Sequence, residues 1–398
     1  MSPYTTAYGI SWQMLWVLVI IWVAIILVLS KVLPVQVGVF VATVKVAITG
    51  SFFALWGDGS WFLGGDDESY YITGIRLITS GENPISIWFS SAGNHILIDR
   101  PSAALYHWLN MFWMYVFEPA YYPPVLGNVF VTSISCLIFD RILILQGFGP
   151  RYRLGFAVFF LLHWYVLAWS SFLNIKEPVI TCLLLLSIYS ILEIQRGKWP
   201  YLILFSLSIF LLWGIRFYIP ALLAGAAALY YVLTSRNKAL LLFITTAVLA
   251  VVMWKYWNTL TLVERLSDFT PASVLKHMVK QFLSPIPWKI TDPATYLIVP
   301  SILHWLLFVP AVIGGISLLS NRQTKGIWLV ALTILAGYTF YSVIPALASP
   351  RHVSPFTTLW ILFEYQFLFS ILKWASCVDH TFGKFHSNSS RSVSFSEE

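Results

Sequence analysis

The chain has 398 residues, of which 58% are hydrophobic and only 10% are charged, and its mean hydropathy is +0.76. This composition excludes a soluble globular domain and predicts an all-α, polytopic integral membrane protein. The net charge of +7 does not require a nucleic acid partner, because Lys and Arg in the inward-facing loops of a membrane protein produce the same balance.

Long apolar runs recur along the chain, and about 20 helical residues are needed to cross a bilayer. Lys45 lies inside the second of these runs. An intramembrane Lys is a candidate functional group, although a bond to a backbone carbonyl would equally explain it. The runs predict about eleven transmembrane helices, at residues 11–33, 34–56, 125–146, 154–172, 179–195, 201–214, 218–233, 239–257, 297–320, 327–346 and 356–376.

An acidic cluster follows the second apolar run, where Asp66, Asp67 and Glu68 stand together in the sequence GDDESYY. A carboxylate in the bilayer core costs several kcal/mol, so this cluster must lie in water at a membrane face. The amphipathic segment that follows, residues 71–81, suits a helix lying in the interface. From the carboxylates alone, two readings remain open: a reacting centre, or acids that only terminate a transmembrane helix.

The basic loops fix the expected orientation, because short loops rich in Arg and Lys face the cytoplasm. For the spans to alternate correctly, residues 101–118 must form a half-embedded or in-plane helix instead of a full crossing. The N-terminus then lies outside and the C-terminus inside. The inward loops are those at 151–153, 196–198, 236–238 and 322–325, and the outward elements are 57–124, 174–178, Arg216, 258–293 and 349–355.

Charged groups from distant parts of the sequence share the outward side. Lys176 and Glu177 stand at the mouth of one span, Arg216 at the end of another, and Arg351 with His352 before the last. A carboxylate base opposite fixed cations suits a reaction in which a phosphate group leaves. Taken singly, each group also has a simpler explanation. Lys176 and Glu177 fit a helix-end salt bridge, Arg216 fits a snorkelling side chain, and Arg351 with His352 fits a contact to lipid headgroups.

The acidic cluster resembles the Asp-Glu-x-x-Tyr element in the first outward loop of C-type (GT-C) membrane glycosyltransferases, with Asp67, Glu68 and Tyr71 on its positions. Protein O-mannosyltransferases and the aminoarabinose transferases of lipid A belong to this superfamily. Residues 99–119 look like the Pro-initiated juxtamembrane helix of the family, although a doubled proline is reduced here to Pro101. Two further stretches extend the likeness: NIKEPVI carries Glu177, SPRHVSPFTTLWIL carries Arg351 and His352, and both are similar to family segments.

The resemblance implies a sugar donor linked to polyprenyl phosphate and a glycan, lipid or protein acceptor, on the non-cytoplasmic side of a bacterial inner or plasma membrane. It implies that Asp67 is the base of an inverting transfer, with Asp66 and Glu68 beside it. It further implies that Tyr71, Glu177 and Lys176 contact substrate and that Arg216, Arg351 or loop lysines hold the phosphate. No cofactor is implied; the carboxylates could take a divalent metal, but no ligand set of recognisable spacing appears.

Two other functions remain open. One is a polysaccharide polymerase that uses polyprenyl-diphosphate repeat units, which would need the cations but not a base in the first loop. The other is a transporter or flippase for lipid-linked saccharides, which would have ionisable residues near the midplane and broken helices. In each case residues 1–376 form one transmembrane domain that contacts membrane lipids, and the polar, Ser-rich segment 377–398 is a cytoplasmic tail predicted to be disordered.

Overall fold

The computed structural model describes residues 11–56, 66–91, 103–234, 270–290, 295–344 and 349–389. All elements in these ranges are helices. They are α1 (Trp12–Leu29), α2 (Val35–Trp56), α3 (Asp66–Thr79), η1 (Ser86–Trp88), α5 (Ala104–Val116), α6 (Tyr122–Leu145), α7 (Pro150–Leu162), α8 (Trp164–Ser170), α9 (Glu177–Gln195), α10 (Tyr201–Ile215), α11 (Ile219–Thr234), α14 (Pro271–Phe282), η2 (Pro287–Lys289), η3 (Thr295–Leu297), α15 (Ile298–Ser320), η4 (Arg322–Thr324), α16 (Ile327–Val343) and α17 (Pro350–Ser389).

The predicted all-α membrane architecture is confirmed in its coarse form. Within the described residues, six helices are long and apolar enough to cross a membrane: α1, α2, α6, α9, α15 with η3, and the first part of α17. The bent pair of α7 and α8 would make a seventh, and α10, α11 and α16 are shorter apolar helices. The predicted span 239–257 lies outside the described residues, so the count of about eleven stays a prediction.

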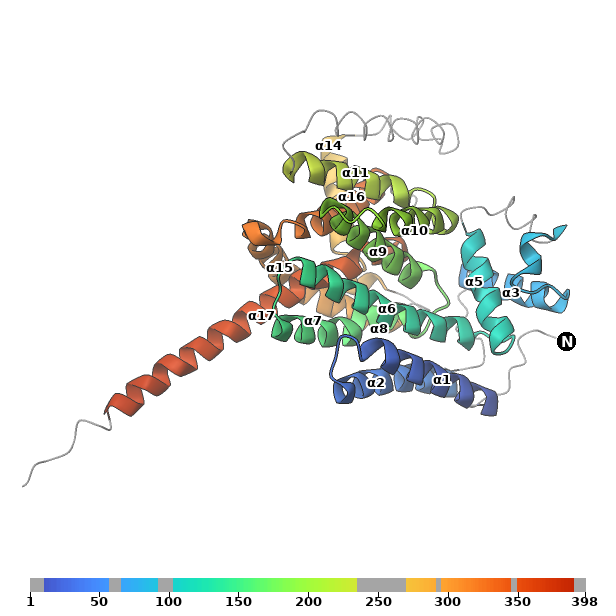
Figure 1. Ribbon diagram of the computed structural model, residues 1–398, viewed down its shortest axis with the longest axis horizontal. Helices are drawn as coiled ribbons and strands as arrows, with labels where there is room; N and C mark the ends of the chain where they lie inside the picture. Colours follow the sequence, from blue (N-terminus) through green and yellow to red (C-terminus); the bar gives the residue numbers. More distant parts are fainter. Residues whose placement is uncertain are drawn as a thin grey trace, which may run out of the picture.

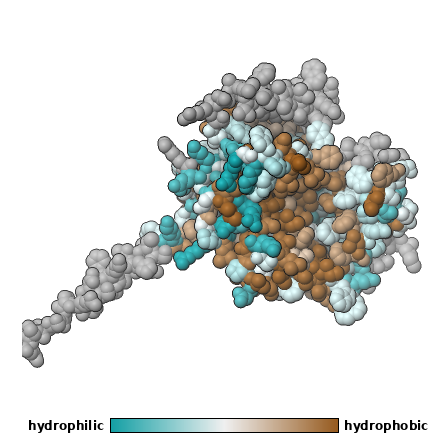
Figure 2. Space-filling view, in the orientation of Figure 1, coloured by the Kyte–Doolittle hydropathy of each residue, from teal (hydrophilic) through white to brown (hydrophobic). Residues whose placement is uncertain are grey.

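The bundle is built around α6, which packs against α1 and α9 (Figure 1). Figure 2 shows why it suits a bilayer: apolar residues cover the middle of the face drawn, and hydrophilic ones gather on the side from which α17 leaves the bundle. At one end α3 packs on α5, and α5 runs steeply across the direction of α6 in Figure 1. With 13 residues, α5 is about 20 Å long, too short to cross the hydrocarbon core.

The contact between α15 and α17 depends on small residues. A Cβ atom on Gly314 would collide with the carbonyl oxygen of Phe363, and one on Gly315 would lie 3.3 Å from the Phe363 ring. Glycine at these two positions lets the two backbones approach closely, as is common between helices in membranes. The packing of α17 in the bundle therefore requires Gly314 in particular.

The predicted span 154–172 is not one straight helix: α7 and α8 meet at a 45° bend at His163. Inside a continuous helix the N–H of Tyr165 would donate to the carbonyl of Leu161. Here it donates to Nδ1 of His163 at 3.2 Å, and the Leu161 carbonyl accepts instead from Nζ of the fully buried Lys45 at 3.4 Å. Lys45 thus makes the backbone-carbonyl bond that the sequence left open as an alternative to a functional role.

A buried triad of His163, Glu364 and His304 connects the bend to α15 and α17. Nε2 of His163 lies 2.8 Å from Oε2 of Glu364 in α17, and Oε1 of Glu364 lies 3.7 Å from Nδ1 of His304 in α15. Nε2 of His304 donates to the carbonyl of Phe282 at 2.8 Å. The three side chains are at most 3% exposed. Elements from three parts of the chain therefore meet at the bend.

The end of the chain differs from its prediction. Disorder was expected from residue 377, but α17 continues as a helix to Ser389, and only 390–398 lie outside the described residues. Extending an existing helix by one residue costs far less than nucleating a new one, so a polar continuation can follow an apolar span.

Candidate functional site

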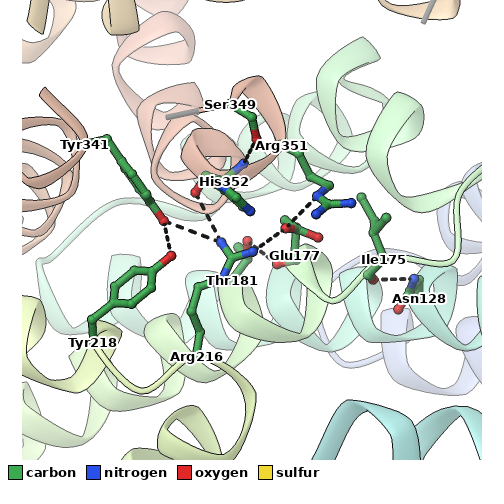
Figure 3. A network of polar contacts seen from close by, with 10 residues as sticks. All are labelled: Asn128, Ile175, Glu177, Thr181, Arg216, Tyr218, Tyr341, Ser349, Arg351 and His352. Carbon is green, nitrogen blue, oxygen red and sulfur yellow. Dashed lines mark hydrogen bonds and ion pairs between the residues drawn. The ribbon is translucent and has the colours of Figure 1, made fainter. Parts of the chain in front are cut away.

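Four ionisable side chains that are far apart in the sequence meet at one end of the bundle. Asp67 comes from the first turn of α3, Glu177 from the first residue of α9, Arg216 from the residue after α10, and Arg351 from the first turn of α17. Figure 3 shows the last three of these pointing toward one another. The outward convergence of these residues was expected from topology, and the structure brings them together in space.

Glu177 is the centre of the cluster. Its Oε1 lies 2.8 Å from Nη2 of Arg216 and 3.6 Å from Nε of Arg351 (Figure 3). The Glu177 and Arg216 side chains are 2% and 4% exposed, whereas that of Arg351 is 24% exposed. Glu177 begins a helix whose second residue is Pro178, and a carboxylate is favoured beside the free N–H groups there. One carboxylate therefore faces two cations, only one of which reaches the surface.

Arg216 is held in place by several partners. The chain leaves the helical conformation at this residue, which caps α10 with φ −159° and ψ 91° and so separates α10 from α11. Its Nη1 donates to the hydroxyl of Tyr341 and to the carbonyl of His352, each at 3.5 Å. The Tyr341 hydroxyl in turn lies 2.7 Å from that of Tyr218. Arg216 therefore faces the protein interior and does not snorkel.

Asp67 lies close enough to the cluster for the charge of Arg351 to act on it, and it is only 4% exposed. Its Oδ2 accepts from the hydroxyl of Tyr121 at 3.4 Å, and that hydroxyl accepts from the backbone N–H of Asn174 at 2.9 Å. Burial raises the pKa of Asp67; backbone N–H groups at the start of α3, the charge of Arg351 and the Tyr121 bond oppose the rise without cancelling it. Burial and the Asp67 charge raise the pKa of Tyr121, so its phenol remains a donor.

A network of buried amides fixes the segment between α8 and α9. The Tyr106 hydroxyl donates to Oδ1 of Asn174 at 3.0 Å, and Nδ2 of Asn174 donates to Asn110. Nδ2 of Asn128 donates to the carbonyl of Ile175 at 2.8 Å (Figure 3). The network joins α5, α6 and the turn that carries Glu177, so the position of Glu177 is set by rigid elements.

The remaining predicted residues have different surroundings. Tyr71 is buried and packs its ring edge-on against Tyr121, with ring centroids 5.7 Å apart. Nζ of Lys176 lies over the ring of Tyr70, the neighbour of Tyr71, at 5.8 Å. Glu68 is partly exposed in the first turn of α3. Asp66 begins α3, but its side chain lies outside the described residues.

The His352 ring stacks on the Tyr341 ring with centroids 6.2 Å apart, so two of the three Arg216 partners pack against each other. Tyr121, Asn174 and Tyr341 also belong to the site, although none of them was among the site residues predicted from the sequence. An Asn three residues before an acid at a helix start was a usable signal for Asn174. For the tyrosines no signal separated them from the many aromatic residues at span ends.

A small cavity of about 20 Å³ lies beside Glu177. This volume is about that of one water molecule. Oε2 of Glu177 is buried and has no hydrogen-bond partner among the described residues. The hydroxyl-bearing residues that line the cavity are Thr132, Ser135, Thr181, Ser354 and Thr358. The cavity beside Glu177 is therefore lined by both hydroxyl groups and apolar side chains.

A metal centre was not predicted, although the carboxylates left room for one. Among the described residues, no group of three or more His, Cys, Asp or Glu side chains is placed to hold a metal ion. The ionisable groups described at this end of the bundle include the buried carboxyl of Asp67, the ion-paired Glu177 and the partly exposed Arg351. Comparison of the chain with protein-family models, with curated proteins and with solved structures finds no match.

Proposed function

We propose that the chain is a membrane glycosyltransferase of the C type, which moves a sugar from a polyprenyl-phosphate donor to a glycan, lipid or protein acceptor on the non-cytoplasmic face. One observation carries the proposal: Arg351 lies 3.6 Å from Glu177, its charge acts on Asp67, and its side chain is 24% exposed. A buried carboxyl and an accessible guanidinium at one place are what the transfer needs.

The reaction uses the two groups in different roles. The acceptor hydroxyl gives its proton to the carboxylate of Asp67, and its oxygen forms a bond to the anomeric carbon of the sugar. The bond from that carbon to the phosphate oxygen breaks, and the phosphate leaves with the electron pair, with inversion at carbon. Arg351 stabilises the charge on the leaving phosphate. A raised pKa makes Asp67 a stronger base than an exposed Asp.

The geometry changes the role given to Arg216. Because its guanidinium is already bound by Glu177, Tyr341 and the His352 carbonyl, it is a positioning residue. It holds Glu177, and Glu177 orients Arg351. The phosphate contact then belongs to Arg351. None of the described contacts joins the lysines of α14 and η2 to Asp67 or Glu177, so those lysines are not assigned to the site.

The test is sugar transfer by the purified protein from a panel of polyprenyl-phosphate hexoses and pentoses to cell-envelope extract. Asp67→Asn preserves size and most hydrogen bonding but cannot take a proton, and we expect a loss of roughly 10²–10⁴-fold in turnover. Donor binding should be nearly intact. The matched control is Asp66→Asn, one position earlier, which should lose far less. Equal activity in both variants, close to wild type, would show that this loop does not hold the base.

The bend at His163 favours a second candidate, a transporter of lipid-linked saccharides. Such proteins have broken helices with ionisable groups near the midplane, and here Glu364, His304 and Lys45 are buried around the bend. A flipping assay with fluorescent polyprenyl-phosphate sugar in liposomes separates the two. Loss of flipping in Glu364→Gln with full flipping in Asp67→Asn would favour the transporter.

A further inference from the structure

A large open cavity lies at the opposite end of the bundle from Asp67. Its volume is about 610 Å³. In Figure 1, α3 and α5 stand at one end of the molecule, whereas the start of α7 and the part of α17 that leaves the bundle stand at the other. The cavity is lined by the link between α6 and α7, the first turn of α7 and one face of α17: residues 147–152, Gln366, Phe369, Ser370 and Lys373.

The cavity is suited to an anion. Among the described residues that line it, Arg151 and Lys373 are the charged ones, and both are exposed cations. The 13-residue helix α7 begins here with Gly149 as its N-cap and no side-chain cap, so the first N–H groups of the helix add positive potential. Tyr152 is only 5% exposed, and its hydroxyl has no hydrogen-bond partner among the described residues.

The position of the cavity along the bundle indicates the source of the anion. Three candidate spans end beside it: α6 ends at Leu145, the bent pair begins at Pro150, and the apolar window of α17 ends at Trp374. The cavity therefore lies where headgroup phosphates meet the hydrocarbon. Its apolar wall is aromatic: the Tyr152 ring stacks on Phe148 at 4.5 Å and meets Phe369 at 4.8 Å. Aromatic rings of this kind favour the interface.

We propose that this cavity binds the phosphate of an anionic phospholipid, with Arg151 and Lys373 on the headgroup and the acyl chains along the apolar faces of α7 and α17. By the positive-inside rule the lipid comes from the cytoplasmic leaflet, where basic pockets between helices bind such headgroups. The proposal is independent of the transferase, because it uses none of the residues around Glu177.

The test is native mass spectrometry of the full chain in detergent, with phosphatidylglycerol or phosphatidylcholine added. We expect the wild-type protein to retain phosphatidylglycerol preferentially, and Arg151→Gln/Lys373→Gln to retain roughly tenfold less. Arg151→Lys/Lys373→Arg should retain most of it, because the charge is kept. The matched control, Arg196→Gln/Lys325→Gln, removes two exposed charges from other inward loops and should bind like wild type.

Three results would overturn the proposal. Equal loss in the Arg151/Lys373 pair and in the control pair would mean that retention depends on total charge, not on this cavity. Displacement of phosphatidylglycerol by millimolar inorganic phosphate would mean that the site takes a soluble anion instead of a lipid. Retention of phosphatidylcholine as strongly as phosphatidylglycerol would also contradict it, since the two cations would then make no difference.

Discussion

The ion pair between Glu177 and Arg216 allows a quantitative prediction. Glu177→Gln leaves the shape of the site intact but removes the charge that balances a buried guanidinium 2.8 Å away, with both side chains under 5% exposed. Removing one partner of such a pair costs about 3–5 kcal/mol, because the other charge stays buried without compensation. With an unfolding entropy of about 2.1 cal/mol/K per residue over 398 residues, this lowers Tm by about 4–6 °C.

The assay is thermal unfolding of the purified protein in one detergent, with Glu193→Gln as the control on the same helix. Nζ of Lys198 lies 3.0 Å from the buried Glu193, but the Lys198 side chain is 53% exposed, so its charge remains solvated and this loss should cost less than that of Glu177. Glu177→Gln/Arg216→Gln should recover more than half of the lost Tm, since the uncompensated charge is gone. A double variant no more stable than Glu177→Gln, or equal shifts in the two single variants, would refute this account.

Three further results are expected. Tyr121→Phe removes a hydrogen bond that stabilises the Asp67 carboxylate, so the pKa of Asp67 should rise. The acid limb of the pH–activity profile should then move to higher pH. An unmoved limb would exclude Asp67 as the titrating base. Gly314→Ala should lower Tm well beyond Gly315→Ala, because its Cβ meets a main-chain carbonyl of α17 that cannot move aside. Ser80→Cys, at an exposed position after α3, should react with an impermeant thiol reagent in intact cells, and labelling only after permeabilisation would reverse the topology.

The positions of most helices could be predicted because a bilayer imposes a length on apolar runs. Helices α6, α9 and α15 lie within a few residues of their predicted bounds. The bend at His163 could not be predicted from periodicity, because the run 154–172 has no Pro or Gly at that point. A lone His in an apolar run was the available signal, and its meaning depends on Glu364, 201 residues away.

The charged residues of the site could be predicted from the sequence, but the residues that hold them in place could not. Topology alone places Glu177, Arg216 and Arg351 on one side, because each ends or begins a span there. Topology cannot say which of the two cations reaches the surface. Arg216 is buried because the chain leaves the helical conformation where α10 ends, and this depends on packing and not on sequence spacing. Likewise, Tyr121 was one aromatic among many until its hydroxyl was found between Asn174 and Asp67.

The hydrogen bonds of the buried triad indicate which ring nitrogen of each histidine carries a proton. Nδ1 of His163 accepts from a backbone N–H, so its proton is on Nε2 and faces Glu364. Nε2 of His304 faces a carbonyl, which can only accept, so it too carries a proton. Nδ1 of His304 and Oε1 of Glu364, 3.7 Å apart, then face each other with lone pairs unless the triad takes up one further proton. With that proton the triad is electrically neutral as a whole, and so the interior of the bundle can contain a carboxyl group at the bend without containing a net charge.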